Sequence, residues 1–305
     1  MSIAKDTLFL INPKANDDNA LKNWKKAVRR FPQLPEEPYD ITTISDLPAF
    51  IEAKNPSLIV IAGGDGTVNF VVNAVLSLNK KPLLAIFPLG FGNALSYCLG
   101  VDTARKALDV IEKKPSILAI DIIKTNIESR PVGVFNIGVG FDARIVHNRQ
   151  GYRYIGFWSY IISGAASLIV HPEKEIRFTI DKKTSLHATA SALVIANCPI
   201  IGQNHVAYTN AKLNDGFLDC TLFNTRYDYV MNVRFKGFKH PLYSEVGKTY
   251  FKAKHLRIEG DPFMQIDGDP EIVTKPLELE VLPQAATFLK NKTENINQIY
   301  LPFIE

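Results

Sequence analysis

A glycine cluster between an apolar run and a helix-forming run constrains this chain more than any other feature. The apolar, β-branched run Leu58 to Ala62 leads into Gly-Gly-Asp-Gly-Thr-Val-Asn at positions 63 to 69, and a helix-forming stretch follows from Phe70 to Leu78. This order predicts a strand, a glycine turn and a helix. Such a turn binds phosphate well, because glycine lets the backbone approach a ligand and the start of a helix offers free N–H groups.

Asp65 stands in the middle of this predicted anion site. A carboxylate there repels phosphate unless a cation bridges the two, or unless the carboxylate takes a proton from a substrate. Both cases indicate phosphoryl transfer, while a glycine-rich turn without a ligand is the alternative. The string is not a P-loop, since no Gly-Lys-Ser or Gly-Lys-Thr follows, and it is not the G-x-G-x-x-G dinucleotide fingerprint.

Length and composition bound the class of protein. With 305 residues the chain is long for one hydrophobic core, so two domains are expected. A formal net charge of +4 permits contact with anionic lipid or nucleic acid without arguing for either. The N-terminus lacks the pattern of a signal peptide, and no run of about 18 apolar residues occurs, so we expect a cytoplasmic protein.

The first third of the chain alternates strand and helix patterns. Strands are predicted at Thr7–Ile11, Tyr39–Ile44, Leu58–Ala62 and Pro82–Phe87, and helices at Ala20–Arg30, Leu47–Lys54 and Thr103–Lys113. This alternation indicates a parallel, doubly wound sheet, whose ligands bind beyond the carboxyl ends of the strands. Three turns lie at such ends, Asn12-Pro13-Lys14, Gly63–Asn69 and Pro88–Asn93, and we expect them to converge.

From Ile117 onward the pattern changes to short recurring strands. Strands are predicted at Ala119–Lys124, Val132–Ile137, Ile176–Ile180, Ala188–Asn197, Phe217–Phe223, Leu256–Glu259, Phe263–Ile266 and Leu277–Leu282. One helix, Trp158–Val170, interrupts them. This spacing is typical of a sandwich or another antiparallel sheet. The apolar end of the chain, Ile299–Ile304, is expected to dock on the first domain.

Four further strings resemble the motifs of one family, in matching order and spacing. They are Pro88-Leu-Gly-Phe-Gly-Asn93, Asn136-Ile-Gly-Val-Gly-Phe-Asp-Ala143, Leu213-Asn-Asp-Gly-Phe-Leu-Asp219 and Gln265-Ile-Asp-Gly-Asp-Pro270. Together with Gly-Gly-Asp-Gly-Thr they are spread over most of the chain. The chain is therefore identified by resemblance as a member of the diacylglycerol kinase catalytic family, which includes bacterial lipid kinases and sphingosine kinases.

The resemblance implies an α/β plus all-β fold, with an N-terminal doubly wound, Rossmann-like nucleotide-binding domain and a C-terminal β-sandwich-like domain. We place the first domain at residues 1–122 with a returning segment at 290–305, and the β-rich lipid-substrate domain at 123–289. The implied function is an ATP- and Mg²⁺-dependent lipid kinase that phosphorylates a primary hydroxyl of a diacylglycerol or sphingoid-base lipid. A NAD-kinase-like or other soluble-substrate kinase and a non-catalytic nucleotide- or lipid-binding regulator are the alternatives.

The resemblance assigns nucleotide binding to the three turns and to Thr43 at the end of the second predicted strand, whose alternative is simple β-propensity. The residues are Asn12, Pro13, Lys14, Thr43, Gly63, Gly64, Asp65, Gly66, Thr67, Val68, Asn69, Gly90, Phe91, Gly92 and Asn93. Two positions depart from the family pattern. Ala15 and Asn16 occupy a turn where the family often has a glycine, and Phe91 stands where it usually has a Thr or Ser hydroxyl. The Phe91 ring would either stack on adenine or fill the site and change the nucleotide.

The resemblance also assigns a metal site to the turn around Asp215. The Asp215 carboxylate and the carbonyl oxygens of Lys212 and Phe217 would hold Mg²⁺, a cation that prefers oxygen ligands. An ordinary Asp-Gly hairpin turn is the alternative.

Two carboxylates, Asp267 and Asp269, are expected to complete the catalytic set with Asp65. A kinase must orient the acceptor hydroxyl, accept its proton and neutralise phosphate charge, and these side chains could share the tasks. The family has a Glu where this chain has Asp269, and Asp is shorter by one C–C link, roughly 1.5 Å. A tight turn between two strands is the alternative.

Basic and aromatic residues gather between Arg226 and Arg257. Such a stretch suits an anionic membrane surface or single-stranded nucleic acid, or it forms a solvated basic face over core aromatics. For a lipid kinase we expect peripheral contact with the membrane that supplies the lipid, and no nucleic-acid partner. A homodimer is left open.

Overall fold

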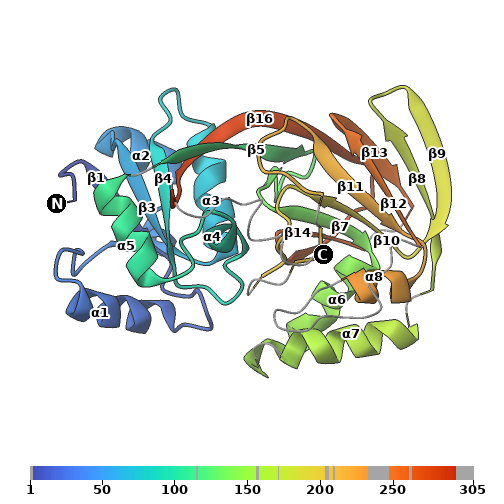
Figure 1. The fold of residues 1–305 in the computed structure, drawn as a ribbon, viewed down its shortest axis with the longest axis horizontal. Helices are drawn as coiled ribbons and strands as arrows, with labels where there is room; N and C mark the ends of the chain where they lie inside the picture. Colours follow the sequence, from blue (N-terminus) through green and yellow to red (C-terminus); the bar gives the residue numbers. More distant parts are fainter. Residues whose placement is uncertain are drawn as a thin grey trace. The chain divides into compact units, whose positions relative to one another are not determined.

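The computed structural model describes residues 3–114, 116–155, 158–170, 172–202, 206–208, 210–232, 247–260 and 263–292. The chain divides into two compact units, Met1–Ile120 with Gln284–Glu305 and Asp121–Pro283 (Figure 1). Most of the predicted returning segment, residues 293–305, lies outside the described ranges. The same holds for residues 233–246 of the basic and aromatic stretch.

A parallel sheet forms the centre of the first unit. Its strands are ordered β2-β1-β3-β4, with β1 at Thr7–Ile11, β2 at Tyr39–Asp40, β3 at Leu58–Gly63 and β4 at Leu83–Pro88. In the parallel register Ile11 lies opposite Ala62, and Gly63 lies opposite Pro88. The three central strands therefore end at the same level, which places the turns that follow them at one edge of the sheet.

Five helices accompany this sheet among the described residues. They are α1 at Ala20–Arg30, α2 at Leu47–Lys54, α3 at Asp65–Leu76, α4 at Ala94–Cys98 and α5 at Ala104–Lys113. Local capping explains where two of them begin, because the Asp46 side chain accepts a hydrogen bond from the Ala49 N–H and Thr103 accepts one from Lys106.

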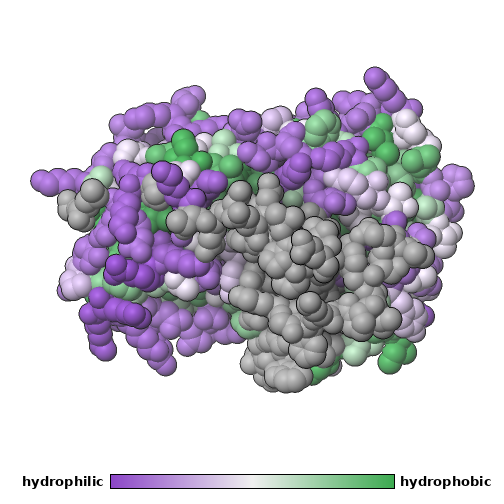
Figure 2. Space-filling model, viewed as in Figure 1, coloured by the Kyte–Doolittle hydropathy of each residue, from purple (hydrophilic) through white to green (hydrophobic). Residues whose placement is uncertain are grey.

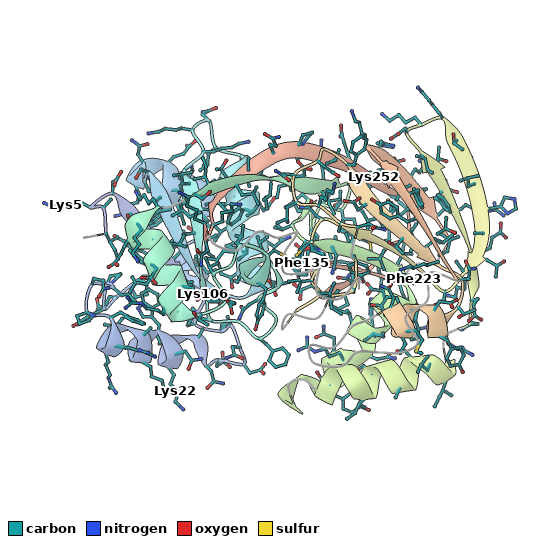
Figure 3. All side chains as sticks on the ribbon, viewed as in Figure 1. Lys5, Lys22, Lys106, Phe135, Phe223 and Lys252 are labelled. Atoms are coloured by element: carbon teal, nitrogen blue, oxygen red, sulfur yellow. The ribbon has the colours of Figure 1, made fainter. Side chains whose placement is uncertain are left out.

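Helix α1 is strongly amphipathic, and its buried face carries an aromatic core. Trp24 is fully buried and packs its ring against Phe9 of β1 and Phe87 of β4, at centroid distances of 6.0 and 5.1 Å. The opposite face is basic, and Lys22 extends away from the helix (Figure 3). Figure 2 accordingly shows hydrophilic side chains over the side of this unit where α1 lies.

Two elements of the first unit differ from the predictions. The strand predicted at Tyr39–Ile44 ends at Asp40, because the Asp40 side chain accepts hydrogen bonds from the N–H and hydroxyl of Thr42 and a 3-10 turn, Ile41–Thr43, follows. Helix α3 begins at Asp65 instead of Phe70, so the glycine motif forms its first turn. The short helix α4 was not predicted.

The second unit is built from two antiparallel sheets. One has the order β12-β11-β10-β7-β14-β15, and the other contains β16-β13-β8-β9 with β5 and β6. Their bounds are Ile117–Thr125 (β5), Val132–Gly133 (β6), Asn136–Gly140 (β7), Lys174–Ile180 (β8), Thr184–Ala190 (β9), Ala192–Ala196 (β10), Leu218–Phe223 (β11), Lys248–Ala253 (β12), His255–Glu259 (β13), Phe263–Ile266 (β14), Asp269–Ile272 (β15) and Leu277–Leu289 (β16).

The core of this unit lies between the two sheets, as the alternation along β10 shows. Leu193 and Ile195 join a cluster that includes Phe178 of β8 and Leu256 of β13. The intervening Val194 belongs to a second cluster on the other side of the sheet. Both faces of β10 are therefore buried. The predicted α/β plus β-sandwich fold is confirmed.

In its described residues this unit also has three α-helices, α6 at Phe141–Arg149, α7 at Trp158–Val170 and α8 at Arg226–Asn232. Only α7 was predicted. Gly140 makes α6 possible, because its φ of +81° turns the chain out of β7 and an added Cβ would lie 2.4 Å from the Ser191 carbonyl oxygen. None of the helices in the described ranges has the length and hydropathy that crossing a membrane requires.

Strand β16 is longer than predicted and contributes to both units. Its first residues pair with β13, while Phe288 lies opposite Leu84 of β4 in a parallel arrangement. Beyond the strand, the Lys290 N–H donates to the Ser116 carbonyl and the Asn291 N–H to that of Leu99. The returning chain is thus hydrogen-bonded to the first unit as far as it is described.

We predict that Phe288→Ala destabilises the protein, because Phe288 is fully buried where β16 joins the parallel sheet. The expected loss in the free energy of unfolding is about 3–5 kcal/mol, measured by denaturant titration. Phe70→Ala is the matched control, since Phe70 of α3 is 48% exposed, and it should change stability by less than about 1 kcal/mol. Equal losses in the two variants would contradict this assignment of β16.

Candidate active site

Two turns of the first unit are joined through Asn12. Its side-chain NH₂ group donates to the Thr67 hydroxyl at 3.2 Å, while its side-chain oxygen, Oδ1, accepts the Lys14 N–H at 3.1 Å. Thr67 is buried in the first turn of α3, and its own N–H donates to the Gly64 carbonyl at 3.0 Å. The turn after β1 is therefore fixed to the glycine motif after β3.

The glycine motif meets the turn after β4 backbone to backbone. A Cβ built on Gly64 would lie 2.9 Å from the Gly90 Cα, and one built on Gly90 would lie 2.2 Å from the Gly64 Cα. The N–H groups of Leu89 and Gly90 both donate to the Gly63 carbonyl, at 2.9 and 3.1 Å. No side chain fits between these loops, which is the physical requirement for glycine at both positions. The expected convergence of the three turns is thus observed.

Asn93 holds the second glycine turn in shape. Its side chain accepts the Gly90 N–H at 3.1 Å and donates to the Gly90 carbonyl at 2.8 Å. Its backbone has φ +50°, a left-handed conformation that Asn tolerates better than most residues. Phe91 and Gly92 lie half-buried inside the turn that Asn93 closes.

The start of α3 combines a helix N-terminus with a carboxylate, that of Asp65. Gly64 caps the helix without a side-chain hydrogen bond, and Asp65 is half-buried in the first turn. Gly66 is exposed beside it, whereas Val68 and Asn69 are buried. The N-terminal end of the helix dipole favours negative charge at this point, either that of Asp65 or that of a ligand.

A hollow of about 310 Å³ borders the Gly90 turn. Lys26 and Arg30 of α1 belong to its lining together with Asn16, so its polar side can receive an anion. Thr43 follows β2 at the same edge of the sheet, since Asp40 lies opposite Ile11; the residue is exposed, and its hydroxyl donates to the Asp40 carbonyl at 2.8 Å. Pro13 is half-buried and Lys14 is exposed in the first turn.

In the second unit, Asp267 is a buried acceptor of three backbone hydrogen bonds. Its carboxylate accepts the N–H groups of Val134, Phe135 and Asn136, at 2.7, 2.9 and 3.1 Å. The side chain is 5% exposed. Because both oxygens are committed to the backbone, this carboxylate anchors the structure around it.

Asp267 and Gly268 form a two-residue hairpin loop between β14 and β15. Both have positive φ, +52° and +84°, and Ile266 pairs with Asp269 across the loop. This is the type I′ geometry that Asp-Gly favours in hairpins. The Gly268 N–H donates to the Gln265 side chain at 2.7 Å, so the loop is fixed from two sides.

Gln265 connects this loop to a buried acid that the sequence analysis did not single out, Asp142. The Gln265 amide donates to Asn136 at 2.7 Å and to Asp142 at 2.8 Å, and the Tyr229 hydroxyl also donates to Asp142. Burial raises the pKa of Asp142, and the hydrogen bonds from Tyr229 and Gln265 act in the opposite direction. Its place in the Gly-Phe-Asp-Ala string could have drawn attention to it.

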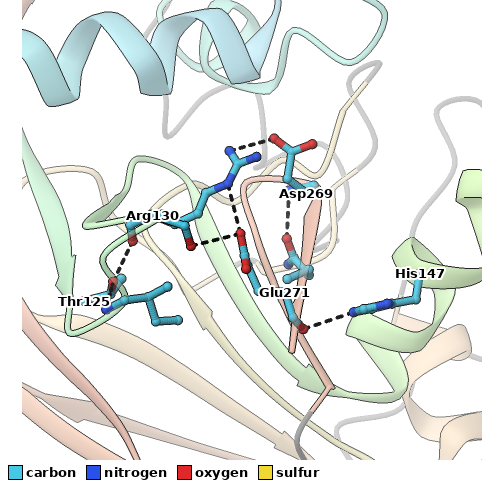
Figure 4. Close-up of polar contacts among 9 residues, drawn as sticks. Thr125, Arg130, His147, Asp269 and Glu271 are labelled. Atoms are coloured by element: carbon cyan, nitrogen blue, oxygen red, sulfur yellow. Dashed lines mark hydrogen bonds and ion pairs between the residues drawn. The ribbon is translucent and has the colours of Figure 1, made fainter. Parts of the chain in front are cut away.

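Asp269 is half-exposed on β15 and is held by an arginine (Figure 4). The Arg130 guanidinium lies 2.8 Å from an Asp269 oxygen and 3.3 Å from Glu271, two positions further along the same strand. The Arg130 carbonyl in turn accepts the Thr125 hydroxyl at 2.6 Å. Asp269 therefore has a fixed carboxylate with one side still open to solvent, unlike Asp267.

The Asp215 turn has a different environment from the predicted one. Asp215 forms an ion pair with Lys252, and the N–H groups of Phe217 and Lys212 donate to Asp215 and Asp219. Within the described ranges, no group of three or more His, Cys, Asp or Glu side chains could hold a metal ion. A cation at Asp215 would compete with the Lys252 ammonium group and the Phe217 N–H for its two oxygens, and the metal site stays a prediction.

Two protein-family models match this chain, one mainly in the first unit and one mainly in the second. The model of the diacylglycerol kinase catalytic domain matches residues 6–125. The model described as the YegS C-terminal NAD kinase beta sandwich-like domain matches residues 135–290, half of the chain.

Two relatives of this chain are bacterial proteins whose names begin with "putative lipid kinase". One, from Staphylococcus haemolyticus, is 29% identical over 243 residues, which cover 78% of this chain and 77% of the relative. Another, from Staphylococcus aureus strain MRSA252, is 28% identical over 263 residues, covering 84% and 85%.

Solved structures share the fold. A diacylglycerol kinase from Bacillus anthracis superposes with a TM-score of 0.66 at 22% identity, covering 94% of this chain and 97% of that one. An NAD kinase from Archaeoglobus fulgidus reaches 0.50 at 12% identity, with coverage of 97% and 98%. The two matched models, in the order in which the motifs occur, show that this chain belongs to the diacylglycerol kinase catalytic-domain family.

Proposed function

We propose that this protein is a lipid kinase that transfers the γ-phosphoryl group of Mg·ATP to a primary hydroxyl of a membrane lipid. The observation that carries the proposal is the side-chain-free contact of Gly64 with Gly90 at the start of α3. Backbone that is bare of side chains, next to a helix N-terminus, is suited to phosphate.

In this proposal the first unit binds the nucleotide. The backbone of the Gly63–Asn69 and Pro88–Asn93 turns receives the phosphates, and the basic hollow next to Gly90 offers room for further parts of the nucleotide. Asp65 is suited to hold the Mg²⁺ that accompanies ATP, whose chemistry would be to neutralise charge on the transferring phosphoryl group. Phe91 keeps its proposed place beside the nucleotide through its backbone.

In the same proposal the second unit binds the acceptor hydroxyl and accepts its proton. Asp269 is the proposed general base, because its carboxylate is partly exposed and Arg130 fixes its direction. Asp267 is proposed to be a positioning residue. Its two oxygens accept the backbone N–H groups of Val134, Phe135 and Asn136 and so hold the loop that precedes Asp269. Fixing the base in this way reduces the reorganisation that the reaction requires.

The lipid as acceptor is supported by the family and by the names of the relatives. A membrane-derived substrate would need peripheral contact with the membrane. The exposed side chain of Tyr227 on α8, 63% accessible with the Arg226 guanidinium 5.8 Å from its ring, is compatible with such a surface. The likeness to an NAD kinase fold supports a soluble acceptor as the rival function.

We predict that Asp269→Asn lowers kcat by about 100-fold or more without weakening ATP binding, because the amide cannot accept the hydroxyl proton. Transfer of labelled phosphate from Mg·ATP to diacylglycerol or a sphingoid base in anionic mixed micelles measures it. Glu271→Gln is the matched control, since Glu271 contacts the same Arg130, and it should keep most activity. Label in NAD or a sugar, with none in any lipid, would favour the rival function.

We predict that Gly90→Ala weakens ATP binding at least roughly 10-fold, because its Cβ would meet the Gly64 backbone and force the two loops apart. Equilibrium binding of a fluorescent ATP analogue measures the change. The control is Gly164→Ala on α7, where an added Cβ has no neighbour within 4 Å. If Gly90→Ala binds ATP with unchanged affinity, the nucleotide does not bind at these loops.

We predict that Asp267→Asn lowers the free energy of unfolding by about 2 kcal/mol, because hydrogen bonds to a charged group are lost and one N–H faces an amide donor. Activity should fall with it. Denaturant unfolding of this variant and of Asp269→Asn distinguishes the roles of the two carboxylates. Asp269→Asn should stay near wild-type stability. A stable but inactive Asp267→Asn would make Asp267 a direct participant instead.

A further inference from the structure

The ion pair at the Asp215 turn is set by the pairing of two strands. Strands β11 and β12 are antiparallel, and in their register Asp219 lies directly opposite Lys252. The Lys252 ammonium group contacts the Asp215 carboxylate and lies 3.5 Å from an Asp219 oxygen. One lysine therefore bridges the two acids, and Figure 3 shows its place in the second unit.

Each oxygen of the two carboxylates already has a donor. Asp215 accepts the Phe217 N–H with one oxygen, at 3.2 Å, and Lys252 with the other. Asp219 accepts the Tyr250 hydroxyl with one oxygen and the Lys212 N–H, at 3.0 Å, with the other. A divalent cation would have to displace several of these donors to obtain the oxygen ligands that it needs.

The acid pair requires a cation because it is poorly hydrated. The side chain of Asp219 is 2% exposed and that of Asp215 is 20% exposed. Burial raises the pKa of Asp219, with Asp215 adding to the rise and Lys252 opposing it. The Lys252 ammonium group contacts both acids and is the cation that faces them.

The Asp215 turn is hydrogen-bonded to Asp121, the first residue of the second unit. The Asp121 N–H donates to the Leu213 carbonyl at 2.6 Å, and the Gly216 N–H donates to the Asp121 carboxylate at 2.7 Å. The Asn197 side chain also donates to the Asp121 carbonyl at 2.6 Å. Any loss of shape in the Asp215 turn would therefore release β5 at its entry into this unit.

We propose that Lys252 is a built-in cation that takes the place of a structural metal ion at the Asp215 turn, so that the turn folds without a bound divalent cation. The inference rests on the contacts of one charged side chain and on the occupied oxygens around it. It does not depend on the proposed phosphoryl acceptor.

Thermal unfolding without nucleotide or lipid tests the proposal. The Tm of the wild type should be the same in excess EDTA, in millimolar Mg²⁺ and in millimolar Ca²⁺. Lys252→Met, which keeps an apolar stem and removes the charge, should lower the Tm by roughly 5 °C or more, because two carboxylates are left without their counter-ion. Lys254→Met is the matched control: Lys254 lies as near the Phe217 ring, 5.4 Å, but its ammonium makes neither contact with the acid pair.

Two results would overturn the proposal. The first is a wild-type Tm that rises saturably with Mg²⁺ or Ca²⁺ and loses this response in Asp215→Asn, which would restore the metal site. The second is a Lys252→Met protein as stable as Lys254→Met. If Lys252→Met does not fold, Lys252→Arg retains the charge and should behave as the wild type does toward EDTA. A lipid kinase assay on the same samples is independent, so a failure of the proposed function would be seen separately.

Discussion

The second unit depends on one buried charge, the carboxylate of Asp267. A carboxylate loses its hydration when it is buried, and here three consecutive backbone N–H groups replace the lost water. Those donors belong to the segment that leads into β7, so the charge ties the β14–β15 hairpin to the centre of its sheet. The Asp267–Gly268 loop is thereby held against this segment, and Arg130 then fixes the direction of the Asp269 side chain next to it.

The parallel half of the fold could be predicted from sequence because its strands and helices are locally consistent. The ranges of α1, α2 and β1 agree with the predictions, since the apolar spacing marks their limits and Asp46 caps α2. The start of α3 could not be predicted in this way. Gly64 and Gly66 disfavour a helix on intrinsic propensity, and only the contact of Gly64 with Gly90 explains why the chain turns there.

The candidate site could be predicted where it lies at strand ends and could not be predicted where it depends on distant pairing. Parallel strands bring their carboxyl ends to one edge, so the convergence of the Asn12, Gly63 and Pro88 turns follows from the pattern alone. The partners of Asp267 are more than 130 positions earlier in the chain, and no local rule names them. Lys252 reaches Asp215 only because β12 pairs with β11 in one particular register.

The path of β16 has a consequence for how the protein forms during synthesis. The parallel sheet is made almost entirely by the first third of the chain, yet Phe288 of β16 is fully buried against it and pairs with Leu84. A growing chain therefore exposes an incomplete edge of this sheet until β16 has left the ribosome. Long-range pairings of this kind close late, because the loop between the partners must be ordered first. The β-sandwich lies inside that loop, so a strand made after the sandwich completes the sheet of the first unit.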